Sequence, residues 1–138
     1  MMVEMELNKI VIDEKRHDQL IVLKEKGGER VLPIVIGLAE ASAIKLKISG
    51  FVPPRPLTHD LFYSTLQNLD ARVDKVVINK LEENTFHAQL YIATGSGATK
   101  VIDARPSDSI ALAVRGKAPI FVEEEVIKKS ETFDKNKW

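Results

Sequence analysis

The sequence predicts a single α+β domain with a mainly antiparallel sheet and three to four helices. Strand-like segments follow one another in runs joined by short turns, which is typical of antiparallel pairing and unlike a parallel sheet wound with alternating helices. The chain has 138 residues, enough for one domain with its own hydrophobic core. Its 44% hydrophobic and 29% charged residues are the composition of an ordinary globular protein.

The first half of the chain is expected to contain three strands and then two helices. The strands are expected at residues 3–13, 20–24 and 30–36, and the helices at residues 38–49 and 59–69. Gly27 and Gly28 can adopt the positive φ values of a tight hairpin turn between the second and third strands. Gly50 ends the first helix, and three prolines in residues 53–56 keep the following connector extended. The second helix is expected to bury Leu61, Phe62, Leu66 and Leu69.

The second half is expected to add four strands and two helices. The strands are expected at residues 73–81, 85–94, 99–104 and 119–122, and the helices at residues 106–115 and 123–129. The Gly-Ser-Gly stretch at 95–97 has the residue types of a hairpin turn and does not match the spacing of a phosphate-binding loop. Gly116 is expected to end the helix before the last strand. One domain is therefore predicted over residues 1–129, followed by a polar tail at residues 130–138.

The charge balance and the absence of cysteine limit the kinds of functional site that the protein can have. Twenty basic and twenty acidic side chains cancel, so any contact with a nucleic acid has to be made by local groups. The absence of cysteine excludes disulfides, thiolate zinc sites and a cysteine nucleophile. The first residues carry acids where a signal peptide needs a basic region, and no apolar run is long enough to span a membrane. A cytoplasmic protein without a membrane partner is expected.

Two similar stretches carry the candidate functional residues. The first corner, residues 54–60, and the second corner, residues 103–108, each place an arginine, a proline, a hydroxyl and an acid where a helix is expected to begin. Free amides at a helix N-terminus favour anions, and a guanidinium can donate two parallel hydrogen bonds to a phosphate. Phosphate binding is therefore expected at Arg55, Thr58, Arg105 and Ser107.

The same corners contain groups suited to phosphodiester hydrolysis. His59 is a candidate general base or metal ligand, and Asp60, Asp108 and Glu40 are the other candidate catalytic groups. Carboxylates at Asp60, Asp103 and Asp108 could hold a divalent cation, Mg²⁺ or Mn²⁺, through oxygen. Two other histidines fit ordinary positions, His87 on an exposed strand face and His17 in a turn. Paired-histidine zinc, nucleophile-elbow and dinucleotide-binding motifs are absent from the sequence.

A purely structural role for the corners is an open alternative. Arg55 could pair with Asp60, and Arg105 could pair with Asp103 or Asp108, so that each arginine only fixes the geometry of its loop. The hydroxyls of the two corners could likewise be helix-capping groups, and acids in a first helical turn commonly complement the helix dipole.

Several stretches of the sequence resemble the bifunctional nuclease domain family. The longest are PRPLTHDL at residues 54–61 and DARPSDSIALA at residues 103–113, and shorter ones occur at 32–37, 40–41, 43–44, 84–88 and 119–122. The resemblance extends over residues 7–127. It implies an α+β fold that tends to form dimers and an activity that cleaves both DNA and RNA. Asn84 stands where the family often has glycine, and asparagine also tolerates left-handed backbone geometry.

The sequence leaves two main hypotheses for the function of the protein, an enzyme and a binding module. The first is a nuclease that hydrolyses DNA and RNA with little sequence specificity and holds phosphate at the two corners, as a homodimer that extends the basic track. The alternative is a non-catalytic regulatory module that binds a nucleotide, an anionic metabolite or an acidic partner. A third possibility is that the corners are structural elements of an obligate oligomer.

Overall fold

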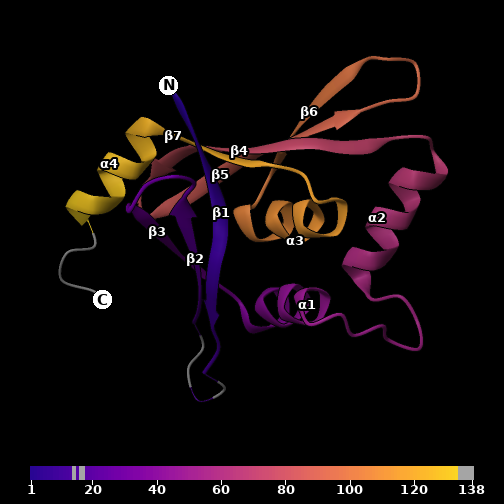
Figure 1. The fold of residues 1–138 in the computed structure, drawn as a ribbon, viewed down its shortest axis with the longest axis horizontal. Coiled ribbons are helices and arrows are strands. Elements are labelled where there is room, and N and C mark those ends of the chain that lie inside the picture. Colours follow the sequence, from indigo (N-terminus) through magenta and orange to yellow (C-terminus); the bar gives the residue numbers. More distant parts are fainter. Residues whose placement is uncertain (14, 16–17, 134–138) are drawn as a thin grey trace.

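The computed structural model describes residues 1–13, 15 and 18–133, and within them seven strands form one sheet accompanied by four helices (Figure 1). The strands are β1 (Met2–Val11), β2 (Gln19–Glu25), β3 (Val31–Ile36), β4 (Arg72–Glu82), β5 (Thr85–Ala93), β6 (Thr99–Ala104) and β7 (Ile120–Glu123). The helices are α1 (Leu38–Ile48), α2 (Thr58–Asn68), α3 (Pro106–Gly116) and α4 (Glu124–Phe133). None of the described helices combines the length and the apolar character needed to cross a membrane.

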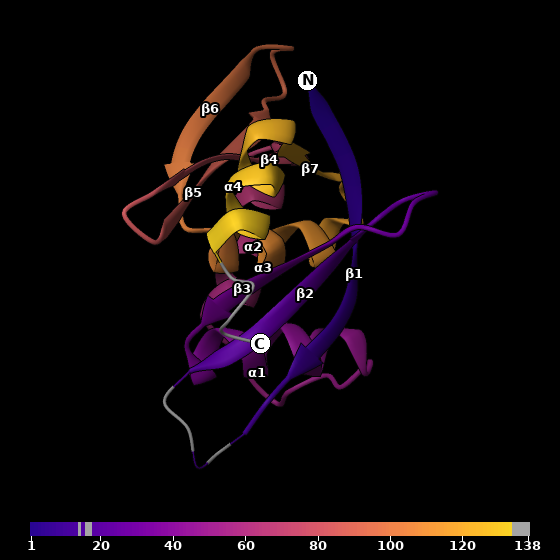
Figure 2. The same ribbon diagram turned by 90° about the vertical axis from the view of Figure 1, so that its left-hand side faces the viewer.

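The sheet confirms the predicted α+β class and its mainly antiparallel pairing. Its strand order is β3-β2-β1-β7-β4-β5-β6, and only the β4–β7 pair is parallel. Three turns have the left-handed backbone that their residue types favour, with φ of 73° at Gly27, 67° at Asn84 and 91° at Gly97. Strand β7 lies between β1 and β4 and so joins the N-terminal strands to the later hairpins. In Figure 2, β5 and β6 lie above, β2 and β3 below, and α3 between them.

Helix α3 is the most deeply buried helix of the fold. It packs against α1, α2, β4 and β5, and its core residues are Ile110, Ala111, Leu112 and Ala113. Alanines on α1 and α3 are small enough to let the two helices approach closely. Burying a side chain such as Ile110 contributes about 1.5–3 kcal/mol, so α3 is a firmly anchored element. The second corner, at the start of α3, therefore has a rigid support.

Helix α2 corrects one of the expectations from the sequence. Its apolar face was expected to be buried, but the exposed fractions are 60% for Leu61, 46% for Phe62 and 70% for Leu69. Only Leu66 of that set is half-buried and packs against the core. The spacing of the apolar residues correctly predicted a helix. The predicted burial of these residues was wrong, because no other part of the described chain covers this side of α2. An apolar face of α2 therefore lies open to solvent.

Two helix ends also differ from the predicted positions. Gly116 remains inside α3, and Lys117 adopts the left-handed geometry that ends the helix, with φ of 53°. A Cβ at Gly116 would lie 3.2 Å from the Tyr63 ring, so glycine at this position serves close packing against α2. Helix α4 continues four residues past its predicted end, and Ser130, assigned to the tail, is buried beside Val126. The predicted turn position of His17 and residues 134–138 of the tail lie outside the described residues.

Candidate functional site

Both corners begin helices, as the prolines predict. The second corner leads from β6 into α3, where Arg105 is the N-cap with extended backbone and Pro106 is the first helical residue. The first corner follows the proline-rich connector, and α2 begins at Thr58 after the extended residue Leu57. The aspartate of each corner is the third residue of its helix. Neither N-cap residue, Leu57 or Arg105, caps its helix through its side chain, and Thr58 and Ser107 are the first and second helical residues of their helices, so they are not N-capping groups.

The two corners meet in a chain of polar contacts that we name the four-residue network, comprising His59, Asp108, Arg105 and Glu40. His59 Nε2 lies 2.9 Å from Asp108 Oδ1, and Arg105 Nε donates to Asp108 Oδ2 at 2.8 Å. The Arg105 terminal nitrogen pairs with Glu40 Oε1 at 3.0 Å. The network thus joins the first turns of α1, α2 and α3, and it includes three of the four residues predicted to be catalytic.

The charges of the network stabilise one another. Burial would raise the pKa of Asp108, but hydrogen bonds with Arg105 and His59 hold it below its usual value. The neighbouring carboxylates, Asp108 first and Glu40 second, raise the pKa of the Arg105 guanidinium. Asp108 is therefore ionised at neutral pH and can only accept hydrogen bonds.

The ionised Asp108 fixes the tautomer of His59. A neutral His59 must carry its proton on Nε2 to donate to Asp108, which leaves Nδ1 with a lone pair. No other described group forms a hydrogen bond with the His59 ring. The His59 side chain is only 16% exposed, so the ring is held between α2 and α3. A histidine oriented by a carboxylate in this way can accept a proton at its free nitrogen.

Asp60 makes structural contacts instead of joining the network. Its Oδ1 accepts a hydrogen bond from Arg115 Nε at 2.9 Å, and its Oδ2 accepts one from the Leu57 backbone N–H at 3.0 Å. Burial would raise the pKa of Asp60, but these two partners lower it overall. Arg115, only 3% exposed, also donates to the Ala111 carbonyl. Sequence reasoning missed Arg115, whose position seven residues after Asp108 places both on one face of α3.

The remaining candidates lie apart from one another. Arg55 is exposed on the connector and has no hydrogen bond or ion pair with any described residue, so the alternative Arg55–Asp60 pair is not formed. Asp103 is exposed on β6 and does not pair with Arg105, whereas the alternative Arg105–Asp108 pair is formed. Thr58 is exposed at the start of α2. Phosphate binding at Arg55, Thr58, Arg105 and Ser107 stays a prediction.

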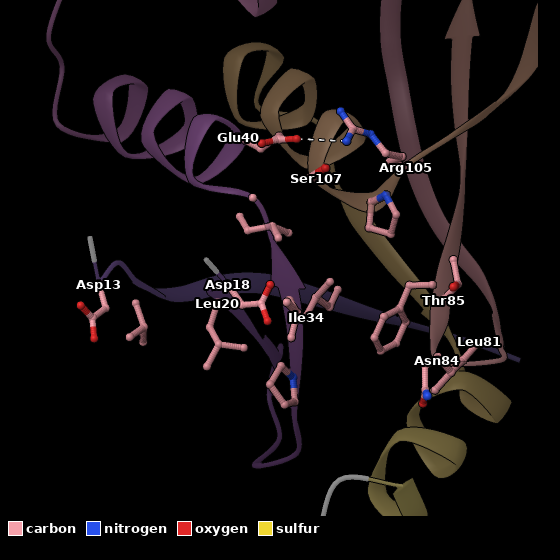
Figure 3. Close-up of a pocket in the computed structure, with 17 residues that line it drawn as sticks. Asp13, Asp18, Leu20, Ile34, Glu40, Leu81, Asn84, Thr85, Arg105 and Ser107 are labelled. Atoms are coloured by element: carbon pink, nitrogen blue, oxygen red, sulfur yellow. Dashed lines mark ion pairs between the residues drawn. The ribbon is translucent and has the colours of Figure 1, made fainter. Parts of the chain in front are cut away.

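Arg105 lines two cavities. The smaller, of about 420 Å³, lies between α2, β6 and α3 and is lined by His59, Phe62, Ile102 and Asp108 among others. The larger, of about 680 Å³, is bordered by β3, the β4–β5 hairpin and the start of α3. Figure 3 shows Glu40, Arg105 and Ser107 together at one end of the larger cavity. Arg105 lines both cavities, whereas Arg55 lines neither.

The three aspartates proposed as metal ligands do not form a metal site as they stand. Across residues 1–13, 15 and 18–133, no three His, Asp or Glu side chains are grouped closely enough to hold a metal ion. Asp60 is turned toward Arg115, and both carboxylate oxygens of Asp108 have partners within the network. Binding of Mg²⁺ or Mn²⁺ by Asp60, Asp103 and Asp108 stays a prediction.

Comparison with known proteins gives one family match and several relatives. A family model described as the bifunctional nuclease domain matches residues 21–135. An uncharacterised protein of Mycobacterium tuberculosis is 42% identical over 118 residues, covering 86% of this chain and 70% of its own. Bifunctional nuclease 2 of Oryza sativa is 32% identical over 114 residues, and bifunctional nuclease 1 of Arabidopsis thaliana is 26% identical over 112. Each match covers 80% of this chain but only 35% and 34% of the respective plant protein.

Proposed function

This chain belongs to the bifunctional nuclease domain family, and we propose that it hydrolyses phosphodiester bonds of DNA and RNA with little dependence on base sequence. The observation that carries the proposal is the His59–Asp108 pair, in which a carboxylate held by Arg105 orients the imidazole. The names of the rice and Arabidopsis relatives support a nuclease. The chain spans about a third of their length, so their activity enters here as part of the proposal.

The proposed reaction uses His59 as the general base. A water molecule attacks phosphorus while His59 Nδ1 takes the water proton, a new P–O bond forms and the bond to the leaving oxygen breaks. The imidazolium that results is stabilised by Asp108 and can return its proton to the leaving oxygen. Arg105, 66% exposed, still has N–H groups beyond those used by Asp108 and Glu40 to stabilise charge on the phosphate oxygens. Dependence on Mg²⁺ or Mn²⁺ is a separate part of the proposal.

Low sequence specificity follows from the groups available. Arg55, Thr58, Arg105 and Ser107 are suited to phosphate oxygens, which are the same at every nucleotide. The equal numbers of acidic and basic residues provide no general attraction for polyanions. Binding is therefore proposed to be weak and to weaken further as the salt concentration rises.

A second candidate function uses the corners for binding alone. Arg105 keeps one terminal nitrogen outside its pairs with Glu40 and Asp108, and Arg55 has no described partner, so both guanidinium groups can still bind an anion. The protein is then a non-catalytic module that binds a nucleotide, an anionic metabolite or an acidic partner. Such a module would bind these ligands without any turnover.

The proposal includes a homodimer in the cytoplasm. Exposed apolar side chains on α2 and β6, among them Leu61, Leu69 and Val101, are the surface that supports dimer formation. A second copy packed there would lie next to the smaller cavity. Light scattering of the wild type and of a Leu61→Ser, Leu69→Ser double variant tests this part, and a monomeric wild type would refute it.

The lack of cysteine is compatible with a reducing cytoplasm.

The nuclease proposal is tested by cleavage of fluorescently labelled single-stranded DNA and RNA. Wild type is compared with an Arg105→Gln, Asp108→Asn double variant prepared in the same way, each with EDTA, with Mg²⁺ and with Mn²⁺. The expected result is cleavage of both substrates by the wild type and at least 100-fold slower cleavage by the variant. Equal rates would assign the activity to a contaminant and refute the proposal. Unchanged cleavage in EDTA would refute the metal requirement alone.

A further inference from the structure

The larger cavity is lined by a hydroxyl that has no partner in the described protein. Ser107, the second residue of α3, is only 5% exposed, and its side chain forms no hydrogen bond with any described residue. It lines the cavity beside the Arg105–Glu40 pair (Figure 3). A hydroxyl that opens into a cavity and has no protein partner can donate to, or accept from, a ligand group there.

The start of α3 offers further hydrogen-bond donors at the same end of the cavity. The first amide that bonds within the helix is that of Ser109, which donates to the Arg105 carbonyl at 3.1 Å. The amides of Ser107 and Asp108 precede it, and no side chain caps this helix. Free amides together with the positive end of the helix dipole favour a compact anion.

Arg105 adds positive charge at this end. Its Nε donates to Asp108 and one terminal nitrogen pairs with Glu40, so the other terminal nitrogen has no ion pair. The start of α1 borders the same cavity, but there the Glu40 carboxylate folds back over Gly37, and a Cβ at Gly37 would lie 2.7 Å from Glu40 Oε2. The Glu40 carboxylate therefore makes the start of α1 unfavourable for an anion, and the donors that remain at this end of the cavity are those of α3 and the second terminal nitrogen of Arg105.

The other walls of the cavity suit an uncharged, partly apolar body. Pro33, Ile34 and Phe86 line it from the two sides of the curled sheet, and Asn84 contributes an amide at the hairpin end. Asp13 and Asp18 lie away from Arg105 in Figure 3 and would repel a second anionic group. The volume of about 680 Å³ lies within the range typical of small-ligand sites.

We propose that this cavity binds a nucleoside monophosphate. The phosphate accepts hydrogen bonds from the Ser107 hydroxyl, from the first amides of α3 and from the free nitrogen of Arg105. The base packs against Pro33, Ile34 and Phe86, with the Asn84 amide available to its polar edge. His59 does not line this cavity, and binding there does not depend on hydrolysis.

Calorimetry with AMP, ribose 5-phosphate, adenosine and inorganic phosphate tests the site on the intact chain. AMP is expected to bind most tightly, because only AMP combines the phosphate with a base. Ser107→Ala should weaken AMP binding at least tenfold through the loss of one hydrogen bond to a charged group. Ser107→Asp should abolish it by repulsion, while an acid at this helix position keeps α3 folded.

Ser109→Ala is the matched control, since Ser109 lies two residues further along α3, is fully buried and does not line this cavity. It should bind AMP as the wild type does. The two Ser107 variants should melt close to the wild type, and Ser109→Ala should melt no lower, because the Ser109 hydroxyl is buried without a hydrogen bond. Absence of saturable AMP binding, equal binding of inorganic phosphate, or undiminished binding by folded Ser107→Ala would each overturn the proposal. The cleavage assay uses other variants, so failure of one proposal is distinguishable from failure of the other.

Discussion

The two corners share their residue types and their position at a helix start, yet the fold uses them differently. In the second corner, Asp108 binds the arginine of its own corner and the histidine of the other. In the first corner, Asp60 binds Arg115 and the backbone, and Arg55 has no described partner. The difference follows from the helices, because α3 is buried among four neighbouring elements whereas α2 lies on the surface.

In the proposed site, the second corner supplies Arg105 and Asp108 and the first corner supplies His59. Residues on α3 are fixed by core packing, so Arg105 and Asp108 have defined positions. From the first corner, His59 contacts Asp108, whereas Asp60 reaches α3 at Arg115 instead. The account therefore assigns chemistry to His59, stability to Asp60 and a peripheral phosphate contact to Arg55.

The largest effect is expected from His59. His59→Gln removes the proposed base while keeping a polar side chain, and the cleavage rate should fall by about 100- to 10,000-fold. His87→Gln makes the same change on β5, where the histidine has no described hydrogen bond, and should leave the rate within about twofold of the wild type. Single-turnover cleavage measures both, and equal loss in the two variants would contradict the assigned role.

Asp60→Ala should act on stability. The substitution leaves Arg115 buried without its carboxylate, which is expected to cost about 3 kcal/mol in the free energy of unfolding. Asp103→Ala removes an exposed carboxylate without a described partner and should cost less than about 0.5 kcal/mol. Urea titration of both variants measures the difference. Similar losses in the free energy of unfolding would contradict the stabilising role assigned to the Asp60–Arg115 pair.

Acid should weaken the network through Asp108. Its pKa is lowered in the folded state, so its contribution is present above the unfolded value of about 4 and disappears as the pH falls through the folded value. Because this side chain is about one-third exposed, the contribution is limited to about 1 kcal/mol. The stability difference between wild type and Asp108→Asn should shrink between pH 6 and pH 2. A difference that is constant over this range would contradict the assignment.

The smallest effect is expected from Arg55. Arg55→Ala should weaken oligonucleotide binding only about two- to threefold and reduce the salt dependence by about one counterion. Lys80→Ala, which also removes an exposed positive charge, is the control on β4. Binding measured by fluorescence anisotropy at several salt concentrations tests this. A loss of affinity as large as that caused by Arg105→Ala would mean that both corners contribute equally to oligonucleotide binding.

The contacts that the sequence predicted are local, and those that it missed are distant in the chain. Turn glycines, prolines and apolar periodicity depend on neighbouring residues, so nearly every strand and helix lies close to its expected position. The His59–Asp108 pair joins residues 49 apart, and Asp60–Arg115 joins residues 55 apart. Neither separation can be read from local pattern. The exposure of Leu61 and Leu69 was missed because an amphipathic pattern does not specify which surface covers it.

A crystal structure of the protein with a phosphorothioate dinucleotide is the most direct test of the claim that His59, Asp108 and Arg105 form one hydrolytic site. The account predicts a phosphate oxygen within hydrogen-bond distance of Arg105, about 3 Å, with phosphorus facing His59 Nδ1 across the smaller cavity. A dinucleotide bound through Arg55 alone, with His59 and Arg105 making no contact to its phosphate, would contradict that claim.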